Sequence, residues 1–513
     1  MASFESVELT KAVMPDSYAL DKRGYEYLFF KIPEDIYDTL SEVRVTMDVI
    51  SGITLLVING YLDNTPIFAQ GMGTTVTFPS DNCEAGENTL AYKGHINITN
   101  IEFIVRAKGA QPVFEKAGDP LLQAVEFLFN SRIRGPQKSP FQGACYCIYD
   151  YNDQTHRMSN WVWNNAVVVG ALLALAKSGL YPEREEEFKN FARGVGEEFL
   201  ATRITGNADP VYGALVSRYK NLGAPSHPAD CLVGPNDTSF SVKWALLPLY
   251  ELTGEKRYYD AACLALQWVR NSIYLGDFVP LDYNTNTGRW GDYTIIDTAF
   301  LPEGLEAFDR LGGSSVYTQD IRYFMNRFID QFALDTGYYG QNYTPKGGVT
   351  RTIFSRGEGW AIEGLLAAYR AAGDPVYLKE ASRLGTLMAD QQNKDGSWSY
   401  VLGYDGRPDS ADKAGTGICE KGTAVLAYFL LELYQVNQDQ RFLDAAGRAL
   451  AWCEENMSRE AGPGYGGINA RSLNSGITGL PYLTTATGYA NAFYILAKIK
   501  RMELEKQFPV SGL

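Results

Sequence analysis

Gly373-Asp374-Pro375-Val376-Tyr377 is one of four copies of the short motif that decides the fold of this 513-residue chain. The other copies are Gly254-Glu255-Lys256-Arg257-Tyr258, Gly313-Ser314-Ser315-Val316-Tyr317 and the partial copy Asp439-Gln440-Arg441-Phe442. The aromatic residue that ends the motif recurs after 59, 60 and 65 residues. Each copy joins an apolar helix to a more charged one. A helical hairpin repeated with this period predicts a closed toroid of paired helices.

The hydrophobic pattern predicts twelve helices from about residue 118 onward. Six of them are apolar on nearly all sides, which predicts an inner ring, and their six more charged partners are expected to form an outer ring. The predicted fold is therefore mainly α, an (α/α)6 toroid over residues 118–513. The expected helices cover 119–132, 160–178, 183–202, 238–253, 256–274, 296–312, 315–333, 357–372, 375–393, 419–435, 439–457 and 485–504.

The first 112 residues follow a different pattern, in which short β-rich runs alternate with turn signals such as Asn59-Gly60. Runs at this spacing predict a small antiparallel β-sandwich over residues 1–112, which ends in a linker at 109–112. We expect this accessory domain to bind a protein partner or a glycan, or to attach the toroid to a larger assembly.

Charge and composition narrow the class of partner. The chain has 46 basic and 60 acidic residues and a net charge of −14, so neither nucleic acid nor a membrane surface is expected as its main partner. A local basic pocket is still compatible with an anionic sugar. The sequence contains no run of about 18 apolar residues, so no transmembrane helix is expected. Residues 1–8 lack the basic start and apolar core of a secretory signal, so a cytoplasmic location is expected.

Cysteine and histidine usage gives little support to cofactor chemistry. The seven cysteines are scattered, and Cys145-Tyr146-Cys147 is too short for ordinary zinc-pair spacing. We expect reduced, mostly buried thiols. Only three histidines occur, His95, His156 and His227, which gives weak support to a His-based metal site or a Ser-His-Asp triad.

The connections from each outer helix to the next inner helix are long, about twenty residues, and rich in Gly, Tyr, Trp and Asn. They include 276–294, 335–354, 394–417 and 462–484. Long ordered loops at one end of a rigid scaffold are where binding sites usually lie. Aromatic residues of these loops, among them Trp290, Tyr339 and Trp398, are expected to stack on sugar rings. The alternative interpretation is that they fill gaps beneath the loops.

Charged residues begin several inner helices and are therefore expected to face one crater. Asp237 and Asp297 begin adjacent inner helices, although both residues also suit a structural role as N-cap or first-turn residues. Two carboxylates that face one cavity are typical of sugar-active enzymes, which need an acid and a base. Arg356 and Glu358 are expected substrate-binding residues. Arg356 suits a substrate carboxylate, but an ion pair with Glu358 is equally compatible with the sequence.

Three segments resemble the unsaturated glucuronyl hydrolases and unsaturated rhamnogalacturonyl hydrolases. They are Asn-Asp-Thr-Ser-Phe at 236–240, Ile-Ile-Asp at 295–297 and Ser-Arg-Gly-Glu-Gly-Trp at 355–360. An Asp-Gly-Ser-Trp turn at 395–398 follows where these families have a similar turn. The resemblance covers roughly residues 150–500. These families have an (α/α)6 barrel and hydrate the C4=C5 double bond of an unsaturated uronic acid.

The resemblance implies a role for each matching residue. Asp297 would be the principal acid/base, which protonates C4 and helps water to attack C5. Asp237 would position water or sugar hydroxyls, and Arg356 and Trp360 would shape the subsite for the uronate. The implied ligand is an anionic oligosaccharide, and the implied reaction uses no cofactor.

Two departures from the family pattern leave other functions open. Thr238 stands where a histidine often follows the first aspartate of the family, and residues 415–421 replace a small Ser/Ala-rich segment. Lys421 in that segment is a candidate for binding a second negative group. The alternatives are a uronate lyase or epimerase, in which a Tyr or His acts near the sugar C5, and a glycan-binding or assembly protein without activity.

Overall fold

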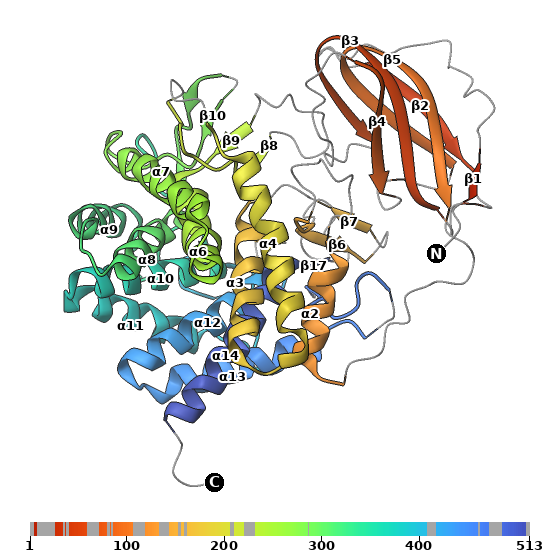
Figure 1. Cartoon of the computed structure of the whole chain (residues 1–513). Coiled ribbons are helices and arrows are strands. Elements are labelled where there is room, and N and C mark those ends of the chain that lie inside the picture. Colours follow the sequence, from red (N-terminus) through yellow and green to blue (C-terminus); the bar gives the residue numbers. More distant parts are fainter. Residues whose placement is uncertain are drawn as a thin grey trace.

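The computed structural model describes residues 5–7, 26–33, 36, 40–58, 71–79, 83, 86–105, 118–132, 143–151, 155–157, 162–205, 210–219, 231–285, 287–407, 417–459, 462–470 and 485–508. Figure 1 shows a helical part, from α2 to α14, and a sheet formed by β1 to β5. The linker expected at 109–112 and the turn at Asn59-Gly60 lie outside the described residues.

Twelve helical segments of the described residues form an inner and an outer layer, as the hydrophobic pattern predicts. The inner segments are α3 (Val162–Ser178), α5 (Pro235–Ser241) with η3 (Val242–Leu246) and α6 (Leu247–Thr253), η4 (Ile296–Phe300) with α8 (Pro302–Gly312), α10 (Ser355–Ala372), α12 (Glu420–Asn437) and α14 (Gly488–Gln507). The outer segments are α2 (Pro120–Asn130), α4 (Glu185–Thr202), which follows the short η2 (Pro182–Arg184), α7 (Lys256–Ile273), α9 (Thr318–Phe332), α11 (Pro375–Asp390) and α13 (Gln440–Glu455). The predicted helical toroid is thus confirmed.

The repeated motif marks the turn from an inner to an outer helix. Gly254, Gly313 and Gly373 each follow the last residue of an inner helix, with φ of 68°, 59° and 64°. Glycine enters this left-handed region without the clash that a Cβ would cause. In the fourth copy, Gln438 takes the same position with φ of 58°. The turn therefore survives there although its glycine is missing.

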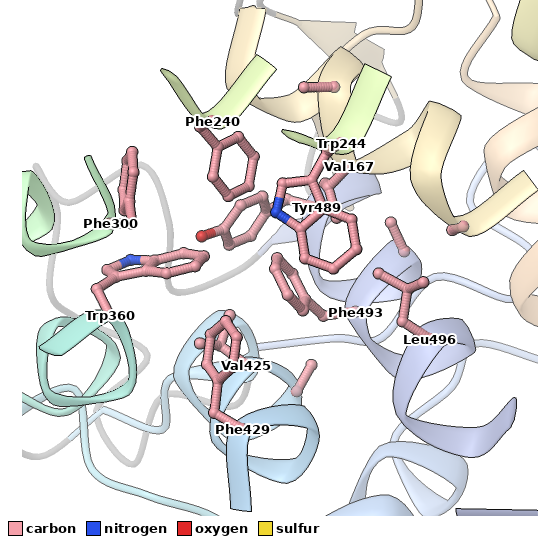
Figure 2. Close-up of a cluster of buried hydrophobic side chains, with 14 of the residues drawn as sticks. Val167, Phe240, Trp244, Phe300, Trp360, Val425, Phe429, Tyr489, Phe493 and Leu496 are labelled. Carbon is pink, nitrogen blue, oxygen red and sulfur yellow. The ribbon is translucent and has the colours of Figure 1, made fainter. Parts of the chain in front are cut away.

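A buried aromatic cluster fills the middle of the toroid (Figure 2). Trp360 of α10 and Val167 of α3 both belong to this cluster, and every inner segment contributes to it. Such rings bury a large apolar area each, which makes the cluster a main source of stability. The ring centroid of Trp360 lies 4.9 to 6.0 Å from the centroids of Phe240, Phe300, Phe429, Tyr489 and Phe493.

Buried charged side chains come after the aromatic cluster in the N- to C-terminal direction of the inner helices. Lys243 Nζ lies 2.9 Å from Glu303 Oε2 and also pairs with Glu363. Arg370 joins Glu363, at 3.1 Å, to Glu432, at 3.3 Å. Burial raises the pKa of Glu303 because the charged form loses its hydration, and Lys243 opposes this shift.

The order of residues along α10 shows which end of the toroid is closed. Arg356 comes first, Trp360 one turn later and Glu363 seven residues after Arg356, roughly 10 Å along the axis. The aromatic cluster and the buried charges therefore lie between the beginnings of the inner helices and their far ends. A cavity that opens where the inner helices begin is therefore closed below by packed side chains.

Short strands lie in the connections that precede the inner helices. Strand β12 ends one residue before η4, and β15 ends one residue before α10, so hydrogen-bonded ladders hold the loops next to the helix starts. These strands are β6 (Ile148–Asp150), β7 (Thr155–Arg157), β8 (Arg218–Tyr219), β9 (Cys231–Val233), β10 (Tyr283–Asn284), β11 (Arg289–Trp290), β12 (Thr294–Ile295), β13 (Asn342–Thr344), β14 (Gly348–Val349), β15 (Ile353–Phe354), β16 (Val401–Leu402) and β17 (Thr485–Thr487).

The N-terminal strands form one five-stranded antiparallel sheet in the described residues. They are β1 (Glu5–Val7), β2 (Glu26–Ile32), β3 (Leu40–Ile58), β4 (Gly71–Pro79) and β5 (Gly86–Val105). The order is β1-β5-β3-β4, and β2 pairs with the first part of β5. Val43, Val45 and Phe78 are buried in a core of their own, separate from that of the helices.

The expected sandwich of two separate sheets is not confirmed, because β3 and β5 are long strands that run through the whole sheet. Phe30 of β2 lies opposite Asn88 of β5, and Phe103 lies fifteen residues after Asn88 along β5. Nevertheless the rings of Phe30 and Phe103 are only 6.2 Å apart. Fifteen residues of straight strand would span roughly 50 Å. The sheet therefore bends back on itself around one core, and register shifts in the β3–β5 pairing accompany the bend.

Two expectations from composition concern the described residues. None of the helices in this part of the chain is both long and apolar enough to cross a membrane. The six cysteines described with their side chains are free thiols, and five of them are buried.

Candidate active site

A cavity of about 240 Å³ lies among the beginnings of the inner helices. Asp237 of α5, Asp297 of η4, Arg356 of α10 and Lys421 of α12 all line it, together with Trp360. These residues are far apart in sequence and meet because the inner helices begin at the same end of the toroid. The other lining residues are Trp163, Ser217, Leu232, Asn236, Phe240, Leu281, Asp282, Ile295, Phe300, Tyr400 and Tyr489.

Asp297 and Arg356 form an ion pair in the cavity wall. Arg356 Nη2 donates to Asp297 Oδ2 at 2.8 Å, and the side chains are 21% and 15% exposed for the arginine and the aspartate. Asp297 Oδ1 and Arg356 Nε are buried and make no hydrogen bond within the described residues. Burial raises the pKa of Asp297, while Arg356 pulls it down. A carboxyl held in this balance suits proton donation as well as proton acceptance.

Asp237 lies in the first turn of α5 and is half-buried at the cavity. The N-cap residue of α5 is Gly234, and that of η4 is Ile295. Neither Asp237 nor Asp297 is therefore the N-cap residue of its helix. Both lie in the first turn, the other structural position that the sequence left open for them, where a carboxylate suits the positive end of the helix dipole.

Lys421 brings a second cation to the cavity. Its Nζ lies 3.3 Å from Glu420 Oε1, and the side chains are 3% and 1% exposed. Burial raises the pKa of Glu420, while Lys421 lowers it. Cys419 caps α12 at this point, since its Sγ accepts a hydrogen bond from the backbone N–H of Gly422 at 3.1 Å. The cavity lining thus contains two cations, each paired with a carboxylate, although the whole chain is acidic.

Trp360 forms part of the cavity floor, where its ring belongs to the aromatic cluster. Sequence reasoning placed it at the site through the family resemblance, but it missed three polar neighbours, Asp282, Tyr400 and Tyr489. Tyr489 begins α14, and burial raises its pKa well above the ordinary value, while Arg356 lowers it. The start of the last inner helix was a usable signal for Tyr489. Asp282 and Tyr400 lie in loops, where no spacing rule singles them out.

Two expected sugar-binding aromatics lie in the core instead of the cavity. Trp398 is fully buried, and its Nε1 donates to the carbonyl oxygen of Met388 at 2.8 Å. Tyr339 is also fully buried, and its hydroxyl donates to Glu380 at 3.1 Å. In this structure neither ring offers a face to a ligand, so the expectation is corrected: both fill space beneath the loops.

Glu358 and Trp290 are also absent from the cavity lining. Glu358 is buried, accepts a hydrogen bond from the backbone N–H of Tyr339 at 3.2 Å, and does not pair with Arg356. Residues two positions apart on a helix point to opposite sides, which is why Arg356 reaches the cavity and Glu358 does not. Trp290 stacks on Trp268 at 5.9 Å. Glu358 therefore has a packing role, and Trp290 lies partly exposed outside the cavity lining.

The described residues contain no cluster of three or more His, Cys, Asp or Glu side chains that could hold a metal ion. His156 is buried beside Tyr146 and Tyr149, away from the cavity lining. His227 lies outside the described residues. The polar side chains that line the cavity carry carboxyls, a guanidinium, an ammonium, phenols, the hydroxyl of Ser217 and the amide of Asn236.

Comparison with known proteins gives matches in structure alone. No family model matches the sequence, and no curated protein matches it. The unsaturated glucuronyl hydrolase of Bacillus sp. GL1 superposes with a TM-score of 0.56 at 15% identity, over 75% of this chain and 97% of its own. Cellobiose 2-epimerase from Bacillus thermoamylovorans has the same TM-score and identity, over 74% and 98% of the two chains.

A D-mannose isomerase also superposes, with a TM-score of 0.55 at 11% identity, over 77% of this chain and 100% of its own. The likeness to unsaturated glucuronyl hydrolases indicated by three sequence segments is thus confirmed at the level of the fold. Proteins with different reactions share that fold, so it does not decide the reaction. The side chains of the cavity have to do so.

Proposed function

We propose that this chain is a glycoside hydrolase that hydrates the C4=C5 double bond of an unsaturated uronic acid at the end of an oligosaccharide. The observation that carries the proposal is the ion pair of Asp297 and Arg356 in the cavity. It sets a carboxyl of raised pKa beside a guanidinium that suits a substrate carboxylate. The fold shared with unsaturated glucuronyl hydrolases supports this choice.

The reaction needs a proton donor at C4 and water at C5. Asp297 transfers its proton to C4, the electron pair of the double bond forms the new C–H bond, and positive charge develops on C5 and the ring oxygen. Water then attacks C5 and returns a proton to the Asp297 carboxylate. The hemiketal at C5 opens to a ketone, and the hemiacetal left at C1 releases the remaining oligosaccharide.

Arg356 has two successive partners in this scheme. In the empty cavity it pairs with Asp297 and lowers the pKa of that carboxyl. A substrate carboxylate competes for the same guanidinium and weakens the pair. The pKa of Asp297 then rises, which favours the protonated form that the first step uses. Substrate binding therefore prepares the acid.

The shape of the cavity supports attack at a chain end. Its volume of about 240 Å³ is below the roughly 300–1,000 Å³ of sites that enclose drug-sized ligands. The aromatic cluster around Trp360 closes it from below. One terminal sugar fits, with Asp237 placed to hold water or a hydroxyl group and Lys421 placed for a second negative group.

A lyase is the second candidate, because Tyr489 is a buried phenol in the same cavity. In that reaction a phenolate would remove the proton from C5 of an intact uronate. However, burial raises the pKa of Tyr489 well above its ordinary value. A phenol that holds its proton is a poor base at neutral pH, which is why hydration is the first choice.

The ultraviolet absorbance of the conjugated double bond distinguishes the two reactions. Unsaturated oligosaccharides from several polysaccharide lyases are incubated with the wild-type protein, Asp297→Asn and Asp237→Asn, and with Asp330→Asn, an exposed aspartate, as the matched control. We expect absorbance to fall with wild type and Asp330→Asn, and to fall about 10²–10⁴ times more slowly with Asp297→Asn.

A fall in absorbance that Asp297→Asn leaves unchanged would remove Asp297 from the mechanism. No fall with any unsaturated substrate would refute hydration for those substrates. If intact polyuronates then gained absorbance with wild type, and lost that gain with Tyr489→Phe, the lyase would be the correct assignment.

A further inference from the structure

Two exposed tyrosines form a stacked pair on the outer surface of the toroid. The ring centroids of Tyr274, at the end of α7, and Tyr323, on α9, lie 5.1 Å apart with planes inclined by 14°. The two residues are 52% and 46% exposed, and the neighbouring Leu275 is 48% exposed. Helices α7 and α9 lie next to each other at the edge of the toroid in Figure 1. We call Tyr274, Leu275 and Tyr323 the tyrosine platform.

Polar contacts hold both rings of the platform in place. The Tyr274 hydroxyl donates to Asp320 Oδ1 at 2.5 Å, and Arg270 Nε donates to the other oxygen of Asp320 at 2.9 Å. Asp320 itself is buried. The hydrogen bond to Asp320 raises the pKa of Tyr274 to about 12, so the hydroxyl stays neutral. The orientation of the Tyr274 ring is therefore fixed in the absence of a ligand.

Arg327 supports the second ring. Its guanidinium carbon lies 5.1 Å from the centroid of the Tyr323 ring, and its Nη1 and Nη2 each donate at 2.7 Å, to the carbonyl oxygens of Gly276 and Ile273. This ties α9 to the segment that carries Tyr274. The exposed aromatic pair is thus held in a fixed geometry with apolar ring area open to solvent.

The platform and the cavity belong to the same connection. Tyr274 begins the loop that follows α7, and Leu281 and Asp282 of this loop line the cavity. The Leu281 N–H donates to the carbonyl oxygen of Tyr293 at 3.0 Å, which fixes the far part of the loop near the start of η4. The same loop therefore carries one ring of the platform and part of the cavity lining.

We propose that the tyrosine platform is a second saccharide-binding site, which holds sugar rings of the polymer outside the cavity. The C–H face of a pyranose carries partial positive charge and apolar area, and both suit the face of an aromatic ring. Arg270 and Arg327 at the rim suit hydroxyl or carboxylate groups of the same chain. The inference rests on the proposed function only in taking a saccharide as the ligand.

A protein partner is the less favoured occupant. A stable protein interface buries about 800 Å² on each side, with a desolvated core. The platform has two rings and one leucine, and charged arginines flank it. This small aromatic surface with a polar rim matches single sugar rings better than a protein surface.

Native-gel affinity electrophoresis tests the platform with polygalacturonate, hyaluronan and a neutral galactomannan dissolved in the gel. Internal sugars of these polymers do not fit the closed cavity, so retardation reports binding outside it. We expect at least one polymer to retard the wild type, and Tyr274→Ala and Tyr323→Ala to weaken that retardation about two- to tenfold. Val376→Ala, at an equally exposed position on α11, is the matched control and should match wild type.

Two further variants make the result specific. Tyr274→Phe keeps the ring face and loses only the bond to Asp320, so it should retain most of the retardation. Asp297→Asn should be retarded like wild type whether or not it hydrates an unsaturated substrate, which separates this inference from the proposed reaction. Retardation of Tyr274→Ala equal to wild type would overturn the proposal, as would no retardation of wild type by any of the three polymers. A change in molar mass of Tyr274→Ala in light scattering, with unchanged retardation, would reassign the platform to a protein interface.

Discussion

A single methyl group added at Gly364 tests how the fold positions Asp297. Gly364 lies on α10, where a Cβ atom would overlap the carbonyl oxygen of Ala299 and lie 2.8 Å from the carbonyl carbon of Ala299 and from Met325 Cε. Ala299 belongs to η4, two residues after Asp297. Gly364→Ala must therefore push η4 away from α10, the helix that carries Arg356.

The size of this effect follows from the contact distances. Carbon atoms in contact prefer roughly 3.5–4.0 Å, so the added methyl group needs about 1 Å of movement from a backbone that is packed on all sides. Overpacking of this kind destabilises by about 1–3 kcal/mol, and the better helix propensity of alanine returns about 1 kcal/mol. We expect a net loss of up to about 2 kcal/mol. A shift of about 1 Å at Asp297 should also lower the rate roughly 10²-fold.

Gly447→Ala on α13 is the matched control, because its Cβ would meet only the movable end of the Arg501 side chain. Urea unfolding, followed by helical circular dichroism, should show Gly364→Ala below wild type and Gly447→Ala equal to it or up to about 1 kcal/mol more stable. The rate of double-bond loss is measured on the same samples. If Gly364→Ala proved as stable and as active as Gly447→Ala, the close packing of α10 on η4 would not be what places Asp297.

Three further changes give distinct results. Arg356→Met removes the cation that lowers the pKa of Asp297, so this pKa should rise in an NMR titration of the labelled carboxyl; an unchanged pKa would show that the pair does not control the acid. Burial raises the pKa of Glu303 above its unfolded value of about 4.3, so the wild type loses stability as the pH rises above that value. From about pH 5 to about pH 9, Glu303→Gln should lose less unfolding free energy than the wild type, and the exposed Glu251→Gln should follow the wild type. Equal pH slopes of the unfolding free energy for all three proteins would contradict this account. Gln438→Gly removes the strain of a non-glycine residue in the left-handed conformation, which should stabilise the protein by about 1 kcal/mol. The loss of the two hydrogen bonds of the Gln438 side chain reduces this gain, and a lower thermal midpoint would show that those bonds outweigh the strain.

The helices could be predicted because helix formation depends on neighbours in the sequence. The motif that ends in Tyr377 contains a left-handed glycine and a first-turn proline, and both act within one turn of chain. Apolar residues on all sides of α10 and α12 likewise predicted burial without knowledge of what covers them. The bend of the N-terminal sheet was not predictable in this way, since it depends on contacts such as Phe30 with Phe103.

Residues at helix starts were the predictable part of the candidate site. Asp237, Asp297 and Arg356 lie where inner helices begin, and the toroid directs all such positions to one end. Loop residues were not predictable, because a loop has no period that relates a residue to a face. Asp282 lines the cavity although no pattern singled it out, whereas Trp398, an expected sugar-binding residue, is fully buried.

The sequence by itself determined the number and order of the helices, the turns between them and the end of the toroid where a site would form. Only the tertiary structure decided which side chains meet there. Arg356 pairs with Asp297, 59 residues away, and not with Glu358, because a helix turns residues two positions apart to opposite sides. Trp398 donates to Met388 in the core because the packing of α11 and α12 leaves its ring no path to the cavity. These contacts depend on distances between segments that are far apart in the sequence, and a local sequence pattern does not predict such distances.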